Sequence, residues 1–387
     1  MRPELARWLV SDAARPALTA AAAEADPTSL AAATRLRALV APDRAATALG
    51  QTALRRRAHP KFGARAESLF LTPDGLEQAT RAPVAARRAG RMAASGVRLV
   101  VDLGCGIGAD ALAFLDAGLD VVAVERDQAT AALAAANLGR EVLVGSAEEL
   151  WPRLAARAGG VFCDPARRTA SGRTWRLEDI SPPWAFVLSL LDGVRPACAK
   201  LGPGVPHAAL PPGAEAEWVS DGGTVVECAL WAGGDAVPGR RRAVVDGAEL
   251  ATDHPASPVG TGGVEEWLYE PDGAVVRAHL VDELAGLVDA ARVHEGVAYL
   301  TASERRRTPF ATAFRVLDEL PLDEKALRAW VRAHDIGTLE IKKRGVDVDP
   351  AALRRRLKPS GRASATLVLT PTPAGARALV VERPSGT

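Results

Sequence analysis

The feature that most constrains this chain is an apolar strand-like run that leads into a glycine-rich turn and then into a helix. The run Val100-Val101-Asp102-Leu103 is followed by glycines at 104, 106 and 108 and by a helical pattern from Asp110. Glycine adopts positive φ and lets the backbone approach a ligand closely. This order predicts the first strand of a parallel α/β sheet, with a nucleotide-type ligand beyond its carboxyl end.

Strand-like and helix-like segments alternate after this turn. Four short apolar runs predict strands, at residues 98–103, 120–124, 141–144 and 160–163. Helical periodicity fills the gaps, at residues 110–117, 128–138 and 148–157. Strands that alternate with helices favour a parallel sheet covered on both faces. Two later runs, 216–219 and 224–231, flank Ser220-Asp221-Gly222-Gly223 and predict an antiparallel hairpin at the far side of this sheet.

The flanking regions have other patterns. Helical spacing dominates the beginning, at residues 17–23, 30–40 and 45–57, and Thr72-Pro73 predicts a capped helix start. Segments 233–242 and 250–263 are rich in glycine, proline and charge, and predict a boundary loop. Beyond it we expect a mixture of strands (264–269, 337–343, 365–369, 377–382) and helices (281–291, 324–333, 350–357). The predicted division is 1–92 helical, 93–245 α/β and 246–387 a smaller α+β domain.

Composition excludes several classes of protein. With 48% apolar and 25% charged residues, the chain is not disordered throughout. Its formal net charge is +1, so any surface for nucleic acid must be local. No 18-residue apolar run lacks a charge and the start does not resemble a signal peptide, which predicts no membrane association and a cytoplasmic location. The four cysteines form no CxxC pair and the histidines are scattered, so no metal site is expected.

Two ligands are compatible with the glycine turn. Gly104-x-Gly106-x-x-Ala109 satisfies the relaxed dinucleotide fingerprint, which favours an NAD-type oxidoreductase. Asp102 before the glycines instead suits a cationic ligand such as S-adenosylmethionine, because a carboxylate repels a diphosphate. Glu125 ends the second strand, where an acid can accept hydrogen bonds from both ribose hydroxyls of either ligand.

The third and fourth strands end in further candidate residues. Ser146 stands where methyltransferases often have an acid that accepts from the adenine amino group; the Ala147 backbone N–H is an alternative, and Ser146 is equally suited to capping the next helix. Asp164-Pro165-Ala166-Arg167 follows the fourth strand. It keeps the Asp-Pro of amino-group methyltransferases but lacks their aromatic residue. Asp164 could orient or deprotonate a nucleophile.

Another segment, Ser181-Pro182-Pro183-Trp184, is closer to that aromatic motif. Its surroundings favour a helix start instead, with Ser181 as the cap and Pro182 as the first residue of a helix that runs to Leu191.

These motifs resemble those of the class I S-adenosylmethionine-dependent methyltransferases. More specifically, the chain is similar to a bacterial family with a helical segment before the methyltransferase domain and a THUMP-like domain after it. The matching stretches are Leu71–Thr80, Asp164–Arg168, Leu268–Asp272 and Leu339–Asp349. The resemblance implies a Rossmann-like α/β sheet, methyl transfer from S-adenosylmethionine, and RNA as the substrate, because true THUMP domains bind RNA.

The resemblance and the motifs together give the candidate site. Its catalytic residues are Asp164, Pro165 and Arg167. Its cofactor-binding residues are Asp102, Gly104, Cys105, Gly106, Gly108, Asp110, Glu125, Arg126, Ser146 and Ala147, with Gln78 from a helix that we expect to cover the cofactor.

The C-terminal region has a local concentration of positive charge. Eight cations occur within residues 342–362, of which Lys342, Lys343, Arg344 and Arg355 are candidate nucleic-acid contacts. A solvated helix face explains the same pattern, and Arg305-Arg306-Arg307 is a further basic run. A non-catalytic RNA-binding protein on a methyltransferase fold therefore remains an alternative to an enzyme.

Overall fold

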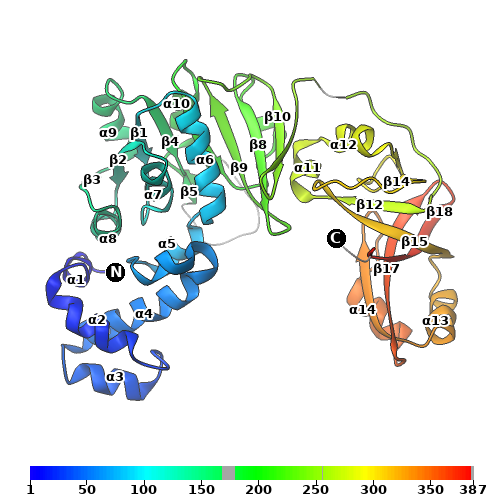
Figure 1. Cartoon of the computed structure of the whole chain (residues 1–387), viewed down its shortest axis with the longest axis horizontal. Helices are drawn as coiled ribbons and strands as arrows, with labels where there is room; N and C mark the ends of the chain where they lie inside the picture. The colour runs from blue at the N-terminus through cyan, green and yellow to red at the C-terminus, as the bar shows by residue number, and fades with distance from the viewer. Residues whose placement is uncertain (168–178, 255, 385–387) are drawn as a thin grey trace. The chain divides into compact units, whose positions relative to one another are not determined.

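The structure is a computed structural model that describes residues 1–167, 179–254 and 256–384 (Figure 1). The chain forms two compact units. The first comprises Met1–Glu215 and Cys228–Gly239, and the second Ala216–Glu227 and Arg240–Thr387. The three-part division at residues 92/93 and 245/246 stays a prediction. Within the described ranges, no helix combines the length and hydrophobicity that crossing a bilayer requires.

The first unit begins with helices, as predicted. They are α1 (Pro3–Leu9), α2 (Arg15–Ala22), α3 (Leu30–Arg37), α4 (Pro42–Phe62), α5 (Pro73–Gln78) and α6 (Ala82–Ala94). The Thr72 hydroxyl caps α5 by accepting from the Gly75 N–H at 2.9 Å. Leu9, Leu36 and Leu49 form a core with Leu133 of a later helix, α8 (Gln128–Leu138). This apolar contact fixes the helical segment to the rest of the unit.

The predicted parallel sheet is present in this unit. Its strands are β1 (Leu99–Leu103), β2 (Asp120–Glu125), β3 (Val142–Val144), β4 (Gly160–Cys163), β7 (Ala197–Leu201) and β9 (Thr224–Ala232), in the order β9-β7-β4-β1-β2-β3. The first four residues of β9 belong to the second unit. All neighbours pair in parallel except β7 and β9. The direction of winding reverses between β1 and β4, which places a ligand crevice beyond their carboxyl ends.

Helices connect these strands and cover the sheet. They are α7 (Ala109–Asp116), α8, α9 (Ala147–Leu154) and α10 (Trp184–Leu191), and two short strands, β5 (Ala166–Arg167) and β6 (Ile180–Ser181), pair between β4 and α10. Met92 of α6, Phe114 of α7 and Phe162 of β4 are buried in one core cluster. The sheet edge that carries the glycine turn is therefore held by packing on both the helical segment and α7.

The second unit is built mainly around another sheet. Its strands are β12 (Trp267–Pro271), β13 (Ala291–Arg292), β14 (Leu300–Ala302), β15 (Ala311–Pro321), β16 (Ile336–Lys343), β17 (Ala363–Thr372) and β18 (Gly375–Glu382), ordered β13-β14-β12-β15-β18-β17-β16. Helices α11 (Gly273–Ala278), α12 (Val281–Val288), α13 (Glu324–Ala333) and α14 (Pro350–Leu357) complete the unit. Leu327, Leu353 and Leu367 pack together in its core.

One expectation was wrong in this region. Residues 241, 242 and 250–252, which were assigned to a boundary loop, belong to two strands, β10 (Arg241–Val245) and β11 (Ala248–Thr252), which pair antiparallel. Strand β10 also pairs in parallel with β8 (Glu215–Asp221). Asp246 and Gly247 have φ of 48° and 90°, the left-handed backbone that an Asp-Gly hairpin turn uses. Charged residues and glycines surround these two positions and favoured a loop, so the two strands were not predicted.

Candidate functional site

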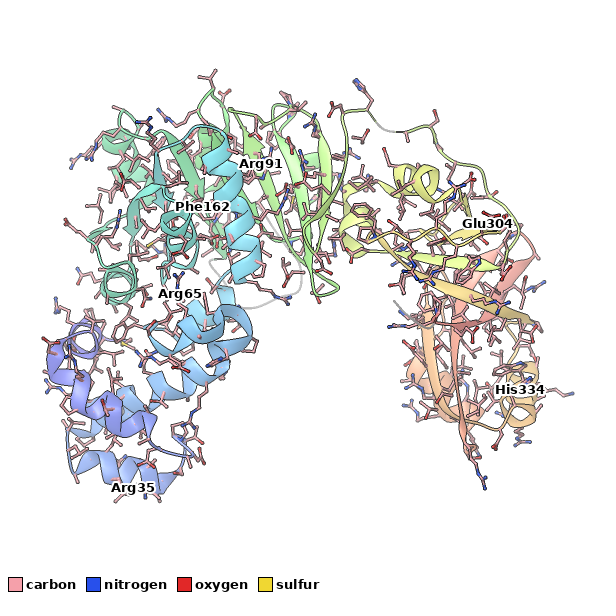
Figure 2. The ribbon with its side chains drawn as sticks, in the orientation of Figure 1. Arg35, Arg65, Arg91, Phe162, Glu304 and His334 are labelled. Atoms are coloured by element: carbon pink, nitrogen blue, oxygen red, sulfur yellow. The ribbon has the colours of Figure 1, made fainter. Side chains whose placement is uncertain are left out.

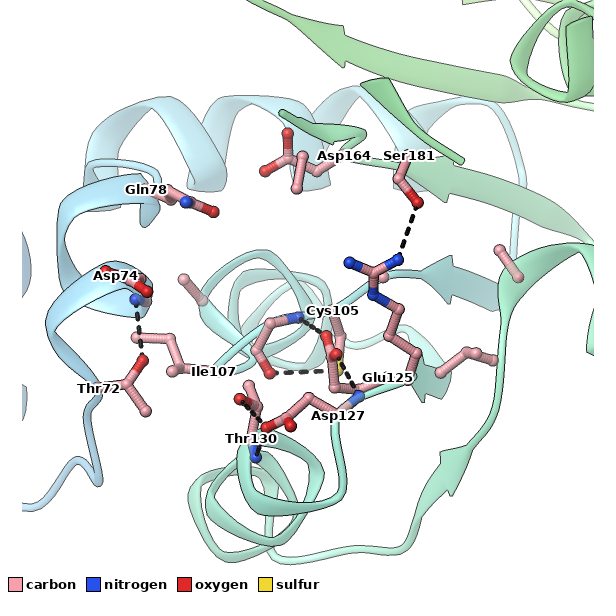
Figure 3. A pocket seen from close by; sticks show the side chains of 18 of the residues that line it. Thr72, Asp74, Gln78, Cys105, Ile107, Glu125, Asp127, Thr130, Asp164 and Ser181 are labelled. Carbon is pink, nitrogen blue, oxygen red and sulfur yellow. Dashed lines mark hydrogen bonds between the residues drawn. The ribbon is translucent and has the colours of Figure 1, made fainter. Parts of the chain in front are cut away.

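A cavity of about 780 Å³ lies at the carboxyl ends of strands β1, β2 and β4 (Figure 3). It is lined by the glycine turn after β1, by the residues that follow β2, β3 and β4, and by helix α5. Its size suits a small-molecule ligand. The sequence placed its candidate residues at these same strand ends, so the topology brings most of them together.

The glycine turn has the backbone that its sequence predicts. Gly104, Gly106 and Gly108 have φ of 97°, 56° and 87°. Gly108 is the N-cap of α7, and a Cβ added there would lie 3.2 Å from the Leu138 side chain. The N–H groups of Gly104 and Cys105 both donate to the Val124 carbonyl at 2.9 Å. The turn is therefore held against β2, and Gly104, Cys105 and Gly106 line the cavity.

Glu125 connects the turn to the end of β2. Its Oε2 accepts from the Gly106 N–H at 3.0 Å and its Oε1 from the Asp127 N–H at 2.9 Å (Figure 3). These two bonds fix the carboxylate at the cavity wall. Each oxygen keeps a further lone pair, so the group can accept hydrogen bonds from a pair of ligand hydroxyls.

Asp102 is placed differently from the other candidates. Its side chain is completely buried and does not line the cavity. Neither carboxylate oxygen has a hydrogen-bond partner among the described residues. Burial raises the pKa of Asp102 well above its usual range, and neighbouring carboxylates raise it further. A buried polar group without a partner is costly, so a nearby cation would stabilise its charged form.

Ser146 and Ala147 both line the cavity at the start of α9. The Ser146 hydroxyl accepts from the Glu149 N–H at 3.2 Å, which makes Ser146 the N-cap of this helix. The capping role, which was one of the two expected from the sequence, is confirmed. Ala147 is the first residue of the helix, where a backbone N–H has no partner within the helix itself.

Asp164 lines the cavity and belongs to a chain of polar contacts. Its carboxylate forms an ion pair with Lys200 of β7. Lys200 donates to the Thr80 hydroxyl at 3.0 Å, and Thr80 donates to Asp110 at 2.7 Å. Burial raises the pKa of Asp164, and the Lys200 ammonium opposes that rise. The chain of contacts links β4, β7, α7 and the segment after α5 through charge-assisted hydrogen bonds.

This chain of contacts contains residues that the sequence analysis did not select as candidates. Arg88 of α6 pairs with Asp110, and its guanidinium lies 4.9 Å from the centre of the Phe162 ring. For Lys200 a signal existed: it is the one charged residue in the otherwise apolar segment Ala197–Leu201. Thr80 and Arg88 had no such signal, because their partners come from distant parts of the chain.

The remaining catalytic candidates are less clearly placed. Pro165 does not line the cavity, whereas Ala166 does. The backbone of Arg167 belongs to β5, and its side chain lies outside the described part of the structure. The thiols of Cys105 and Cys163 are buried, and burial raises the pKa of both well above the ordinary value. Neither is suited to act as a nucleophile.

The segment Ser181-Pro182 contributes to the cavity, contrary to its expected capping role. Helix α10 begins at Trp184, and the N-cap is Pro183. Ser181 and Pro182 instead line the cavity, and Arg126 donates to the Ser181 hydroxyl at 3.1 Å (Figure 3). The bond explains why Ser181 faces Arg126 rather than the helix.

Helix α5 forms the wall that includes Gln78. Its carboxyl end is held by Lys61 of α4, whose ammonium donates to the carbonyls of Leu76, Glu77 and Ala79 at 2.6, 2.7 and 3.0 Å. Burial lowers the pKa of Lys61, and the positive charge of Lys200 lowers it further. Gln78 and Asp74 appear on this side of the cavity in Figure 3.

The basic candidates of the second unit are partly neutralised. Lys342 pairs with Glu270 at 2.6 Å, and the Arg344 guanidinium lies 5.4 Å from the centre of the Tyr299 ring. Lys343 and Arg355 are exposed. Alternation along β16 directs Lys342 and Lys343 to opposite faces of the sheet.

The charge of the cavity indicates which ligand fits. Its described lining includes six carboxylates (Asp74, Asp110, Glu125, Asp127, Glu148 and Asp164) and one arginine, Arg126. Such a lining repels a diphosphate and attracts a ligand with ammonium and sulfonium groups. The Asp102 carboxylate, which has no hydrogen-bond partner among the described residues, also favours a cationic ligand. The residues present therefore fit S-adenosylmethionine better than a dinucleotide.

Comparisons with known proteins agree with this geometry. A family model described as THUMP domain-like matches residues 311–383. An uncharacterised S-adenosylmethionine-dependent methyltransferase of Mycobacterium tuberculosis H37Rv is 35% identical over 346 residues, which cover 86% of this chain and 94% of the relative. A crystal structure from Porphyromonas gingivalis W83, described as a methyltransferase, superimposes with a TM-score of 0.75 at 20% identity, covering 96% of this chain and 99% of that chain. The last match shows the shared fold.

Proposed function

The chain belongs to the family of S-adenosylmethionine-dependent methyltransferases that includes the Mycobacterium tuberculosis relative, and we propose that it methylates RNA. Membership confirms the resemblance found in the sequence, together with the Rossmann-like sheet and S-adenosylmethionine as cofactor. The acceptor is the proposed part. Its support is the THUMP domain-like match at residues 311–383, since THUMP domains bind RNA.

Different cavity residues are proposed to contact different parts of the cofactor. Glu125 would accept the ribose hydroxyls, and the glycine turn of Gly104, Cys105 and Gly106 would lie against the cofactor with little steric hindrance. The Ala147 N–H and Ser146 would meet the adenine. Gly108, Asp110, Arg126 and Gln78 complete the proposed cofactor set, and Asp102 would supply negative charge from behind the turn.

The observation that carries the catalytic proposal is the ion pair between Asp164 and Lys200 at the cavity wall. Bound S-adenosylmethionine supplies an electrophilic methyl group. Asp164 would orient the acceptor and take its proton, and Lys200 would keep Asp164 ionised for that task. Holding the acceptor in line at near-attack distance supplies much of the rate in such a transfer. Pro165 and Arg167 would shape the acceptor side of the cavity.

The proposal also covers the location of the protein, its division into domains and the cations that contact RNA. The cytoplasm, where RNA and S-adenosylmethionine both occur, is the proposed location. The proposed domains are 1–92, 93–245 and 246–387. The exposed cations Lys343 and Arg355, with Lys342 and Arg344, are proposed to contribute to RNA affinity.

The test is to incubate purified protein with methyl-tritiated S-adenosylmethionine and an extract from a strain that lacks the gene. The labelled material is then split between nuclease and protease digestion. We expect nuclease to release the label as a methylated nucleotide, and the Asp164→Ala variant to transfer none. Release by protease alone would contradict RNA as the acceptor. Unchanged transfer by Asp164→Ala would remove the catalytic role of that residue. A wild-type protein that binds S-adenosylmethionine but transfers no label would favour a cavity that merely binds the cofactor.

A further inference from the structure

A second cavity, in the second unit, is lined by arginines that the site above does not use. It has a volume of about 510 Å³ and lies between the loop 303–310, the first residues of β15 and the end of β18. Glu304, labelled in Figure 2, belongs to this loop. The polar lining of the cavity consists of Arg305, Arg306, Arg307, Arg383, Thr308 and Thr312. No carboxylate lines it among the described residues. We call this cavity the arginine groove.

The charges of the arginine groove are largely uncompensated. Arg306 pairs with Asp289 at 2.7 Å. Arg305, Arg307 and Arg383 have no ion-pair partner among the described residues, and the Arg305 Nε is buried without a hydrogen-bond partner in the described chain. Like charges held side by side repel one another, so a polyanion that binds here would relieve that repulsion.

The loop is held in place before any ligand binds. The Tyr269 hydroxyl accepts from the Arg306 N–H at 2.7 Å and donates to the Arg306 carbonyl at 3.2 Å. The Asp272 N–H donates to the Phe310 carbonyl at 2.8 Å. The guanidinium groups of Arg305 and Arg383 lie 5.6 and 5.7 Å from the ring centres of Trp267 and Phe314. Arg305 and Arg306 are thus held on a fixed loop, and Arg305 and Arg383 lie over aromatic rings, which lowers the entropy cost of binding.

We propose that the arginine groove binds the phosphodiester backbone of RNA. The proposal deepens the proposed function, because it identifies where the substrate is held outside the methyl-transfer cavity. Guanidinium groups recognise phosphate oxygens with paired, charge-assisted hydrogen bonds, and threonine hydroxyls donate to phosphates as well. Proline and alanine make up the rest of the lining and leave the groove open to a sugar-phosphate chain.

The groove is a stronger candidate than the cations of 342–362. In that region Lys342 pairs with Glu270, and Arg356 pairs with Glu324 at 2.7 Å. An ion-paired cation must first give up its partner, so it contributes less to phosphate binding. The three arginines without ion-pair partners lie in one groove, whereas the exposed Lys343 and Arg355 belong to a strand and a helix.

The test measures RNA binding by the full chain over a series of salt concentrations. The probe is a fluorescent single-stranded oligoribonucleotide of mixed sequence, followed by anisotropy. The groove variant is Arg307→Ala/Arg383→Ala. The matched control, Lys325→Ala/Arg332→Ala, removes two exposed cations from helix α13, which does not line the groove. A further variant, Arg307→Lys/Arg383→Lys, keeps the charge but loses the paired hydrogen bonds, and it guards against misfolding of the alanine variant.

We expect the groove variant to bind RNA at least tenfold more weakly than the control at low salt. Loss of two phosphate contacts should reduce the salt slope by about 1.4, at roughly 0.7 per contact for single strands. The lysine variant should keep the slope and lose part of the affinity. Groove and control variants that bind alike would overturn the proposal. So would a wild-type protein that binds an acidic polyglutamate peptide but not the RNA probe.

Failure of this inference is separable from failure of the proposed function. Methyl transfer to RNA by the wild-type protein, with RNA binding unaffected by the groove variant, overturns the groove alone. RNA binding that depends on the groove, without transfer to RNA, overturns the proposed acceptor and leaves the groove in place. Calorimetry with S-adenosylhomocysteine should give the same affinity for all variants, because the groove arginines do not line the cofactor cavity.

Discussion

The ammonium group of Lys200, on strand β7, forms an ion pair with the carboxylate of Asp164, at the end of strand β4. The same ammonium donates to the Thr80 hydroxyl, which joins the pair to Asp110 and to the helical segment. The Lys200 ammonium thus opposes the rise that burial causes in the pKa of Asp164.

Replacing Lys200 should move the pH dependence of methyl transfer. Burial already raises the pKa of Asp164, and Lys200 lowers it by charge and by hydrogen bonding. In Lys200→Met both effects are lost, so the pKa of Asp164 rises further and the acid limb of the kcat profile shifts to higher pH. Lys200→Arg keeps the charge and should keep the profile close to wild type. An acid limb that stays in place in Lys200→Met would show that Asp164 does not titrate in the reaction.

Glu125→Gln should weaken cofactor binding. The carboxylate accepts from two backbone N–H groups, and the amide nitrogen of glutamine cannot accept from either. We expect the Kd for S-adenosylhomocysteine, measured by calorimetry, to rise about tenfold to a hundredfold. Glu149→Gln, the same change at an exposed residue of α9 that does not line the cavity, is the control and should bind like wild type. Equal affinities of the two variants would exclude Glu125 from the cofactor site.

Cofactor binding should release a proton through Asp102. Burial holds the pKa of this carboxyl high in the free protein, and a bound cation favours its charged form and lowers that pKa. The affinity for S-adenosylmethionine should therefore increase with pH up to the pKa of the free protein. Titrations in two buffers of different ionisation enthalpy should reveal the released proton, and Asp102→Asn should abolish it. A wild-type titration without proton release would contradict the electrostatic role of Asp102.

Gly108→Ala should destabilise the first unit. Gly108 has a φ of 87°, and an added Cβ would lie 3.2 Å from Leu138. The left-handed backbone alone costs about 1–2 kcal/mol for alanine, and the contact adds to it. Denaturant unfolding should show this loss in the free energy of unfolding. Gly50→Ala is the control. This glycine is exposed within α4, and beyond its chain neighbours and the nearby backbone of its own helix no heavy atom lies within 4 Å of its Cβ position. Alanine there should raise stability by up to about 1 kcal/mol. Equal effects would contradict the strain assigned to the turn.

The order of strands and helices in the first unit could be predicted because each segment carries its own periodicity. Gln128–Leu138 and Gly160–Cys163, for example, have the predicted bounds. The strands β10 and β11 were missed because arginines and glycines surround them, although Asp246-Gly247 is a recognisable hairpin turn. Strand β15 was missed because most of its residues are at least partly exposed and it carries no long apolar run.

The site residues, too, could be predicted where a local motif specifies them, but not where they depend on contacts between distant segments. The glycine turn, Glu125 and Asp164 follow single strands, so position within a motif was enough to find them. Lys200, Thr80 and Arg88 act through side-chain contacts between remote segments, which no local pattern specifies. Ser181 satisfies the rules for a helix cap, but its bond with Arg126 places it at the cavity instead.

The most direct test of the central claim is a crystal structure of the protein with S-adenosylhomocysteine. The account predicts that the ligand occupies the cavity beyond β1, with its ribose hydroxyls on Glu125 and its sulfur directed toward Asp164. A ligand bound elsewhere, or bound in this cavity with its sulfur directed away from Asp164, would contradict both the cofactor site and the proposed catalytic residue.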